Sequence, residues 1–234
     1  MDQTLSRFMA IVALAIAVSG CATADLPVAS IPSGPVPAMP SAVSSLAAPL
    51  ADPMPASASA AVTPGGYVSF CLRFPDQCET TPNAPTSIAL TPQAWATLAK
   101  VNSDVNAAIW PEDDSRHYGR VEYWTIPSDG YGDCEDYALT KRKNLAGLGL
   151  PLSALRIAVV VTPSEVRHAV LTVVTDKGDF VLDNLTNDIL PWDQTGFTWI
   201  ERQAPGNAMA WVSLRPADRM LASTGDSMIT GGTH

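Results

Sequence analysis

Positive charge is scarce in this chain. Its 234 residues hold 14 lysines and arginines against 23 aspartates and glutamates, a formal net charge of −9. Nucleic acids and anionic lipid surfaces attract basic proteins, so this balance argues against either as the main partner. No internal repeat is evident, which favours one globular domain over a repeat array.

Long hydrophobic runs are also lacking. The apolar stretch from Phe8 to Val18 follows Arg7 and is too short to span a bilayer as a stable helix. Small residues follow it, so residues 1–24 are predicted to be an export signal that directs the chain across the inner membrane into the periplasm. A short buried helix is the alternative interpretation.

Two cleavage sites are consistent with this signal. Val18-Ser19-Gly20-Cys21 resembles a lipobox, which would leave a lipidated Cys21 at the new N-terminus, whereas Ala22-Thr23-Ala24 is an acceptable site for ordinary release. We favour the lipoprotein, because Cys21 otherwise has no explanation. Ala22 after that cysteine favours the outer membrane as the place of the anchor.

Charge is almost missing from residues 25–66, where only Asp25 and Asp52 are charged among nine prolines and many alanines and serines. Such a segment buries too little surface to order itself, so it is predicted to be a semi-extended tether. A domain is then expected over residues 67–214, followed by a flexible tail over residues 215–234.

Cysteine is rare, with four in the chain. In an oxidising periplasm, Cys71 and Cys78 are predicted to form a small loop disulfide, since no nearby histidine supports a metal site. With Cys21 assigned to lipid, Cys134 is the free thiol that remains. An unpaired cysteine in an exported protein needs an explanation, and catalysis is one.

Cys134 lies in the stretch Tyr131-Gly132-Asp133-Cys134-Glu135-Asp136-Tyr137-Ala138-Leu139. It follows a glycine turn and begins a helical pattern that ends at Gly147. The N–H groups at a helix start favour a thiolate, so the position suits a nucleophile.

A histidine and an aspartate lie on two later apolar runs. His168 begins the run 168–175, and Asp183 lies near the end of the run 180–185, with a turn signal at 176–179 between them. The two runs are therefore predicted to form an antiparallel hairpin. A turn at Lys177-Gly178 places Asp183 opposite Thr172, four positions from His168, so an offset turn or a bulge is needed to bring the two side chains together.

Three motifs in this order resemble the bacterial transglutaminase-like cysteine proteinases: Gly132 to Ala138, His168-Ala169-Val170 and Leu182-Asp183-Asn184. The resemblance covers roughly residues 67 to 214. It implies Cys134 as nucleophile, His168 as base and Asp183 as the residue that orients the base. The implied fold is α+β and papain/transglutaminase-like, with the cysteine helix packed on an antiparallel sheet.

The resemblance also implies partners. The family includes periplasmic LapG-like proteases that clip large surface adhesins and are restrained by an inner-membrane cyclic-di-GMP receptor. This implies a protein substrate in the cell envelope, although a lipid anchor departs from the soluble periplasmic members. Arg167, just before His168, has no role in the family pattern and is a candidate for tuning substrate choice.

Three carboxylates surround the thiol: Asp133, Glu135 and Asp136. Acidic groups in a first helical turn can simply complement the helix dipole, yet beside a thiol they raise its pKa. Calcium bound to two or three of these residues would resolve the conflict, and calcium dependence is what the resemblance implies. No organic cofactor is expected.

The remaining segments have simpler interpretations. Thr91-Pro92 is predicted to start a helix whose apolar stripe is Trp95, Leu98, Val101, Val105 and Ile109, and the acidic group Glu112-Asp113-Asp114 with His117 is predicted to be a solvated loop. Trp124 is expected either to line the substrate groove or to pack in the core. Strands are expected at 155–161, 197–200 and 211–214.

The sequence therefore predicts a cysteine peptidase that acts through a thioester on an envelope or periplasmic protein. A transglutaminase-type amide transfer by the same three residues is one alternative. A catalytically silent binding module is the other, in which Cys134, His168 and Asp183 have structural roles only.

Overall fold

The fold is built around an antiparallel sheet. The computed structural model describes residues 50–55 and 59–215, and within them seven strands pair in the order β1-β9-β8-β4-β5-β6-β7. These strands are β1 (Ala60–Ala61), β4 (Leu155–Val161), β5 (Arg167–Thr175), β6 (Gly178–Leu182), β7 (Leu190–Pro191), β8 (Thr198–Ala204) and β9 (Asn207–Ser213). A short parallel pair joins β2 (Trp110–Pro111) to β3 (Tyr131–Gly132). The antiparallel sheet expected from the family resemblance is confirmed.

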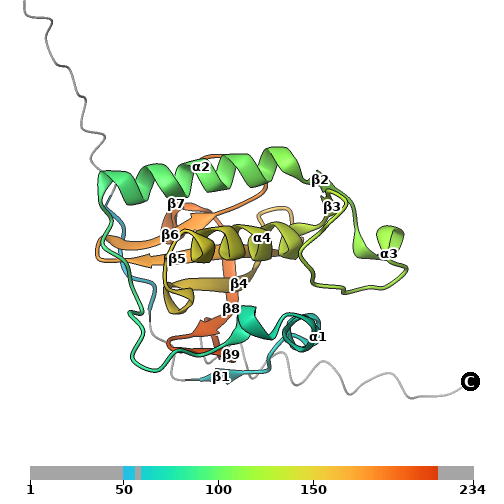
Figure 1. The fold of residues 1–234 in the computed structure, drawn as a ribbon, viewed down its shortest axis with the longest axis horizontal. Helices are drawn as coiled ribbons and strands as arrows, with labels where there is room; N and C mark the ends of the chain where they lie inside the picture. Colours follow the sequence, from blue (N-terminus) through green and yellow to red (C-terminus); the bar gives the residue numbers. More distant parts are fainter. Residues whose placement is uncertain (1–49, 56–58, 216–234) are drawn as a thin grey trace, which may run out of the picture. The chain divides into compact units, whose positions relative to one another are not determined.

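Two long helices lie together beside this sheet. Figure 1 shows α2 (Pro92–Ala108) alongside α4 (Cys134–Gly147), and α4 packs mainly against β5 and also against β4. The shorter helices are α1 (Gly65–Arg73), α3 (Asp114–His117), η1 (Pro75–Cys78), η2 (Leu152–Ala154) and η3 (Trp192–Gln194). Within the described residues, no helix has the length and apolar character needed to cross a membrane.

The ends of α2 and α4 follow their sequence signals. Thr91 caps α2, because its hydroxyl oxygen accepts the Ala94 N–H at 3.1 Å while Pro92 occupies the first turn. The predicted stripe is buried at Leu98, Val101, Val105 and Ile109, with Trp95 partly buried against the same core. The helix predicted from Cys134 to Gly147 has those bounds in α4.

Alternation along the central strands gives the sheet two apolar faces. Ile157 and Val159 of β4 join the main core with α4, whereas Ala158 and Val160 face the other side. That second face is covered by aromatic side chains from the segment before and within β8: Trp192, Phe197 and Trp199. Both faces are covered by apolar side chains, which is why β4 is hydrophobic without interruption from Ile157 to Val161, after Arg156.

Ordered structure begins before the predicted boundary at residue 67. Ala60 and Ala61 pair with Val212 and Trp211 of β9, and Met54 is buried. The Ala51 N–H also donates to the carbonyl of Lys177 at 2.8 Å. The tether interpretation is therefore wrong for residues 50–55 and 59–66, because these small residues gain main-chain partners on the sheet that composition cannot reveal. The export signal, Cys21 and the tail from residue 216 lie outside the described residues.

Candidate active site

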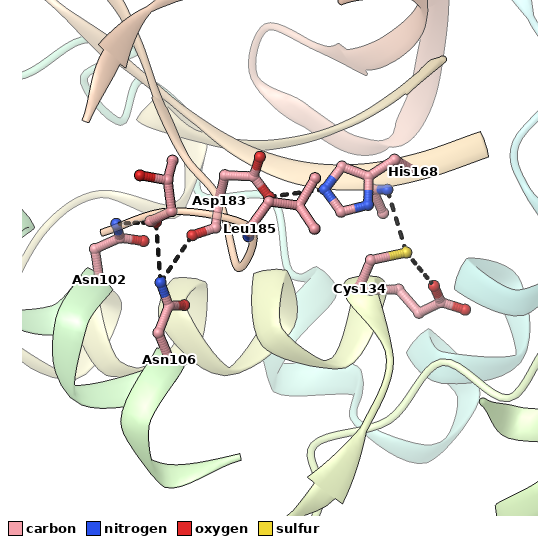
Figure 2. Close-up of polar contacts among 9 residues, drawn as sticks. Asn102, Asn106, Cys134, His168, Asp183 and Leu185 are labelled. Carbon is pink, nitrogen blue, oxygen red and sulfur yellow. Dashed lines mark hydrogen bonds and ion pairs between the residues drawn. The ribbon is translucent and has the colours of Figure 1, made fainter. Parts of the chain in front are cut away.

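Cys134 is the first residue of α4, where the chain turns tightly. A Cβ on the preceding Gly132 would lie 2.7 Å from Asp136 Oδ2, so glycine is required there. The sulfur has two polar contacts, shown in Figure 2: the thiol donates to Glu135 Oε2 at 3.1 Å, and the Ala169 N–H donates to Sγ at 3.4 Å. The second contact ties the cysteine helix directly to β5.

His168 and Asp183 form a close buried pair. His168 Nε2 lies 2.7 Å from Asp183 Oδ1, and the two residues are 6% and 5% exposed. Figure 2 shows the imidazole between the carboxylate and Cys134, with Nδ1 on the side of the sulfur. Asn184, the alternative partner for His168, makes no hydrogen bond to it in the described structure, and Asn184 Oδ1 is buried without a hydrogen-bond partner. Cys134, His168 and Asp183 therefore lie together.

The hairpin register explains how Asp183 reaches His168. Thr175 pairs with Gly178 and Leu171 with Leu182, so the turn comprises Asp176 and Lys177. The register predicted from the sequence is therefore wrong by two residues, since continuing the observed one sets Asp183 opposite Val170. That position is diagonal to His168 on the same face, where side chains are within reach of each other. No bulge is needed.

Helix α2 holds the segment that carries Asp183. Asn106 Nδ2 donates to the carbonyls of Asp183 at 2.9 Å and Thr186 at 3.0 Å, and contacts Asn187 Oδ1 at 2.9 Å. One turn earlier, Asn102 Nδ2 donates to the carbonyls of Thr186 and Asn187. Figure 2 shows both amides aimed at this segment, so α2 fixes the position of Asp183 through its main chain.

The electrostatics at Cys134 oppose ionisation. Burial raises the pKa of the thiol well above its usual value, and the adjacent Glu135 raises it further by charge and by the hydrogen bond. The Ala169 N–H lowers it only in part. The thiolate expected from the helix start is therefore not favoured while Glu135 remains against the sulfur.

A group of three carboxylates lies close to Cys134. Oxygens of Asp114, Asp133 and Asp136 lie within 4.8 Å of one another, and one oxygen of each is buried without a hydrogen-bond partner in the described structure. Burial raises the pKa of Asp133 to about 6 and that of Asp136 to about 8. Burial, followed by the charge of Asp133, raises the pKa of Glu135 to about 9. Carboxylates held this close together repel one another when charged, and such a group is typical of a cation site.

The composition of this group differs from the predicted one. Asp133 and Asp136 belong to it, whereas Glu135 lies with Asp133 and Cys134. Asp114 was predicted to lie in a solvated loop; that is wrong, because it is 1% exposed and accepts the Tyr123 N–H. His117, in the same predicted loop, has its Nε2 2.9 Å from Asp129 Oδ2. In the described structure it makes no hydrogen bond to Cys134.

Cys134 lines two adjoining cavities. One has a volume of about 660 Å³ and is walled partly by residues 62–66, and the other has a volume of about 390 Å³ and extends to Val166 and Leu185. Both are lined by Cys134, His168 and Arg167. An extended chain crossing the sulfur would therefore have space on either side. Trp124 lines the larger cavity and is also buried against Tyr67, so its predicted packing in the core is confirmed.

The predicted disulfide is confirmed. Cys71 and Cys78 form a disulfide, with an S–S distance of 2.03 Å. Cys134 is the free cysteine of the described residues.

Comparison with protein families decides what this site belongs to. The model of the bacterial transglutaminase-like cysteine proteinase family (BTLCP) matches residues 57–219. The chain belongs to this family. It is thus a cysteine protease with a transglutaminase-like fold, as the three motifs predicted. Among curated proteins, none matches the sequence.

Solved structures of Legionella pneumophila LapG are similar to this proteinase. An EGTA-treated form is 29% identical, with 51% of this chain and 67% of that chain covered and a TM-score of 0.44. A calcium-bound form is 23% identical, with 56% and 80% covered and the same TM-score.

Three residues of this region were not predicted from the sequence: Asp114, Asn102 and Asn106. Asp114 lies 19 positions before Asp133 and joins it only through the tertiary fold, so no local signal identifies it. Asn102 and Asn106 did leave a signal. Two amides four residues apart flank the apolar stripe of α2, a spacing that puts both on one face of a helix.

Proposed function

We propose that this proteinase hydrolyses a peptide bond with Cys134 as nucleophile, His168 as general base and Asp183 as the residue that orients the imidazole. One observation carries the proposal: His168 bonds Asp183 at 2.7 Å while its neighbour Ala169 donates to the Cys134 sulfur. Three residues from α4, β5 and the end of β6 are thereby held in one cluster. Such a cluster is the arrangement that cysteine acyl transfer requires.

The contacts assign a nitrogen to each task. Because Nε2 donates its proton to Asp183, Nδ1 carries the free lone pair and accepts the thiol proton. The thiolate then attacks the carbonyl carbon, and the Cys134 N–H at the helix start is a donor to the developing oxyanion. The imidazolium returns its proton to the leaving amine, which leaves a thioester. Water, deprotonated by His168, then releases the acid.

A thiol-directed acyl probe tests the enzyme against the silent binding module. Labelling is expected in the wild type and is expected to vanish in Cys134→Ala and fall sharply in His168→Ala. Equal labelling of Cys134→Ala would contradict the proposal. Product mass separates hydrolysis from amide transfer, because only transfer joins two chains with loss of ammonia.

Calcium is proposed as the cation for the carboxylate group. Asp114, Asp133 and Asp136 would hold it, since each offers a buried oxygen without a partner and calcium prefers carboxylate oxygen. Bound calcium would supply positive charge beside Cys134, which favours the thiolate. Glu135, the other predicted ligand, is adjacent and can turn from the sulfur to the same group.

The calcium proposal is tested by thermal unfolding. Chelation is expected to lower the Tm and the activity of the wild type, and Asp114→Asn is expected to lose the calcium-dependent part of the Tm. Asp104→Asn is the matched control, because Asp104 is an exposed carboxylate paired with Lys100 on α2. If chelation changed neither quantity, calcium would have no place in this site.

The substrate is proposed to be a protein of the cell envelope, reached by an enzyme lipid-anchored through Cys21 in the periplasm. The export signal and the lipobox-like sequence support this location. Fractionation of wild type and Cys21→Ser tests the anchor, since the variant is expected to leave the membrane fraction. Mass spectrometry of envelope and released proteins from wild-type and Cys134→Ala cells should reveal new termini that depend on the thiol, and their absence would remove this substrate class.

A further inference from the structure

A third cavity lies apart from the candidate active site. Its volume is about 250 Å³, and it shares no lining residue with the two cavities at Cys134. Its walls come from the segment after the disulfide, from the residues around η2 and from the turn between β8 and β9. Two arginines, Arg142 of α4 and Arg156 of β4, line it.

Main-chain carbonyls fix both guanidinium groups. Arg142 donates from Nε to Leu155 at 3.0 Å and from Nη1 to Gln77 at 2.5 Å. Arg156 donates from Nε to Ser153 at 3.1 Å and from Nη2 to Thr86 at 3.2 Å. Among the described residues, Arg142 Nη2 and Arg156 Nη1 have no hydrogen-bond partner. Both side chains line the cavity, so each arginine can offer one free nitrogen to a ligand there.

No carboxylate balances this charge. Arg142 is 1% exposed and Arg156 is 6% exposed, yet neither has an acidic group within 4.0 Å in the described part of the chain. Arg202 on the neighbouring strand is different, because it pairs with Asp179 at 2.6 Å. The one acidic residue that lines the cavity, Glu79, is exposed.

Burial without an opposite charge has a measurable cost. It lowers the pKa of Arg142 and lowers that of Arg156 to about 10, with the nearby Arg202 adding to the second shift and Asp179 opposing it. Buried charges are normally paired with an opposite charge, so two guanidinium groups without a carboxylate at one cavity favour the binding of an anion there.

We propose that this cavity binds a small oxyanion, a phosphate or a carboxylate, between Arg142 and Arg156. Each arginine can donate to one oxygen of such an anion through its free nitrogen, which gives two charge-assisted hydrogen bonds, and the carbonyl contacts hold both guanidinium groups in place before binding. The cavity exceeds the size of a water molecule and is smaller than typical drug-sized sites, so the ligand is a free anion or a small metabolite. Because Arg142 belongs to α4, binding there stabilises the helix that begins at Cys134.

Thermal unfolding of the full chain tests the proposal, with sodium phosphate or sodium acetate compared with sodium chloride at equal ionic strength and no added calcium. The preferred anion is expected to raise the Tm by about 3 °C at tenfold its Kd. The two salts distinguish phosphate from carboxylate. Arg156→Gln is expected to lose the shift, and Arg120→Gln, which changes an exposed arginine outside the cavity, is expected to keep it. A wild type that responds to neither salt, or an equal shift in Arg156→Gln, would overturn the site.

A second variant covers the case in which Arg156→Gln does not fold. Thr81 is exposed at the cavity, and Thr81→Glu brings in a carboxylate that competes for the same arginines. This variant is expected to have a raised Tm without added anion and no further shift with it, whereas Thr81→Gln keeps the wild-type response. If Thr81→Glu responded to the anion like the wild type, the two arginines would not be the binding groups.

Discussion

The sulfur of Cys134 donates its hydrogen bond to Glu135 Oε2 at 3.1 Å. A carboxylate in this place stabilises the protonated thiol, so the residue that follows the nucleophile keeps it in its unreactive form. His168 is held by its hydrogen bond to Asp183. In the proposed mechanism, proton transfer from Cys134 is therefore opposed by Glu135 rather than by the orientation of His168.

Asp183→Asn tests the orientation of the imidazole. The amide retains the size of the carboxylate but can present an N–H to Nε2, which favours the wrong tautomer, so kcat is expected to fall by roughly 10³-fold or more. The Tm should change little by comparison. Asn184→Ala is the matched control and should retain most activity, because Asn184 makes no hydrogen bond to His168 in the described structure; a larger loss in Asn184→Ala would assign the orienting role to that residue.

Lys141 is a buried ammonium group two helical turns after Cys134. It is 0% exposed, its Nζ has no hydrogen-bond partner in the described residues, and the ring of Tyr137 lies 6.0 Å away. Burial lowers its pKa to about 7, with the charge of Asp183 opposing the shift. Because the pKa is lower in the folded state than in the unfolded state, the unfolded chain binds more protons between about pH 7 and pH 10, and stability rises with pH there.

Lys141→Met should therefore stabilise the protein. The gain at pH 6 is expected to be about 2 to 4 kcal/mol, because a buried charge is replaced by an apolar side chain of similar length, and it should shrink as the pH approaches 10. Chemical unfolding at several pH values measures both quantities. A gain that did not depend on pH would show that the pKa of Lys141 is the same in the folded and unfolded chains, contrary to the shift expected from burial.

At the scale of elements, α2 supports the site without touching the nucleophile. Its two amides hold the segment from Asp183 to Asn187 to the helix by five contacts. Asn106 contacts the carbonyl of Asp183 itself, whereas Asn102 contacts only Thr186 and Asn187. Variants of the two residues can therefore distinguish an effect on the stability of the segment from an effect on the position of Asp183.

Asn106→Ala and Asn102→Ala form a matched pair. Each should lower the free energy of unfolding by about 1 kcal/mol, since partly buried carbonyls lose their donors. Only Asn106→Ala should also lower kcat, by roughly tenfold, with little change in KM. Equal losses of kcat in both variants would mean that the segment acts as one unit and that the contact to Asp183 has no separate effect.

At the scale of the whole molecule, the segment before residue 67 is part of the enzyme. Besides pairing through β1, it donates from Thr63 Oγ1 to the carbonyl of Met209 at 2.8 Å, and its residues 62–66 wall the larger cavity at Cys134. It therefore contributes both to the edge of the sheet and to the space for substrate.

Two shortened chains test this contribution. A chain that starts at residue 67 is expected to have a Tm lower by about 5 °C or more than one that starts at residue 50, because it exposes β9 and the core around Met54. It should also have a higher KM, since one wall of the larger cavity is missing. Equal Tm and KM in the two chains would restore the boundary at residue 67.

The sequence predicted the parts of the site that local pattern determines. Periodicity and turn residues predicted the helix from Cys134 to Gly147 and the strand that carries His168. Cysteine spacing predicted the disulfide. The turn was predicted one residue too late, at Lys177-Gly178 instead of Asp176-Lys177, which shifts the strand pairing by two residues; the residues at both positions favour a turn equally. Asp114, Arg142 and Arg156 become buried only through contacts made far along the chain, and a charged residue in a local pattern is normally assigned to the surface.

The paired cysteines have a consequence for the unpaired one. An oxidising medium, in which Cys71 and Cys78 form a disulfide, is also one in which peroxide can attack an exposed sulfur. Peroxide reacts with the anion and much more slowly with the neutral form, so the hydrogen bond to Glu135 shields Cys134 from conversion to sulfenic acid between turnovers. The hydrogen bond that opposes thiolate formation in the proposed mechanism is therefore also expected to protect Cys134 from oxidation.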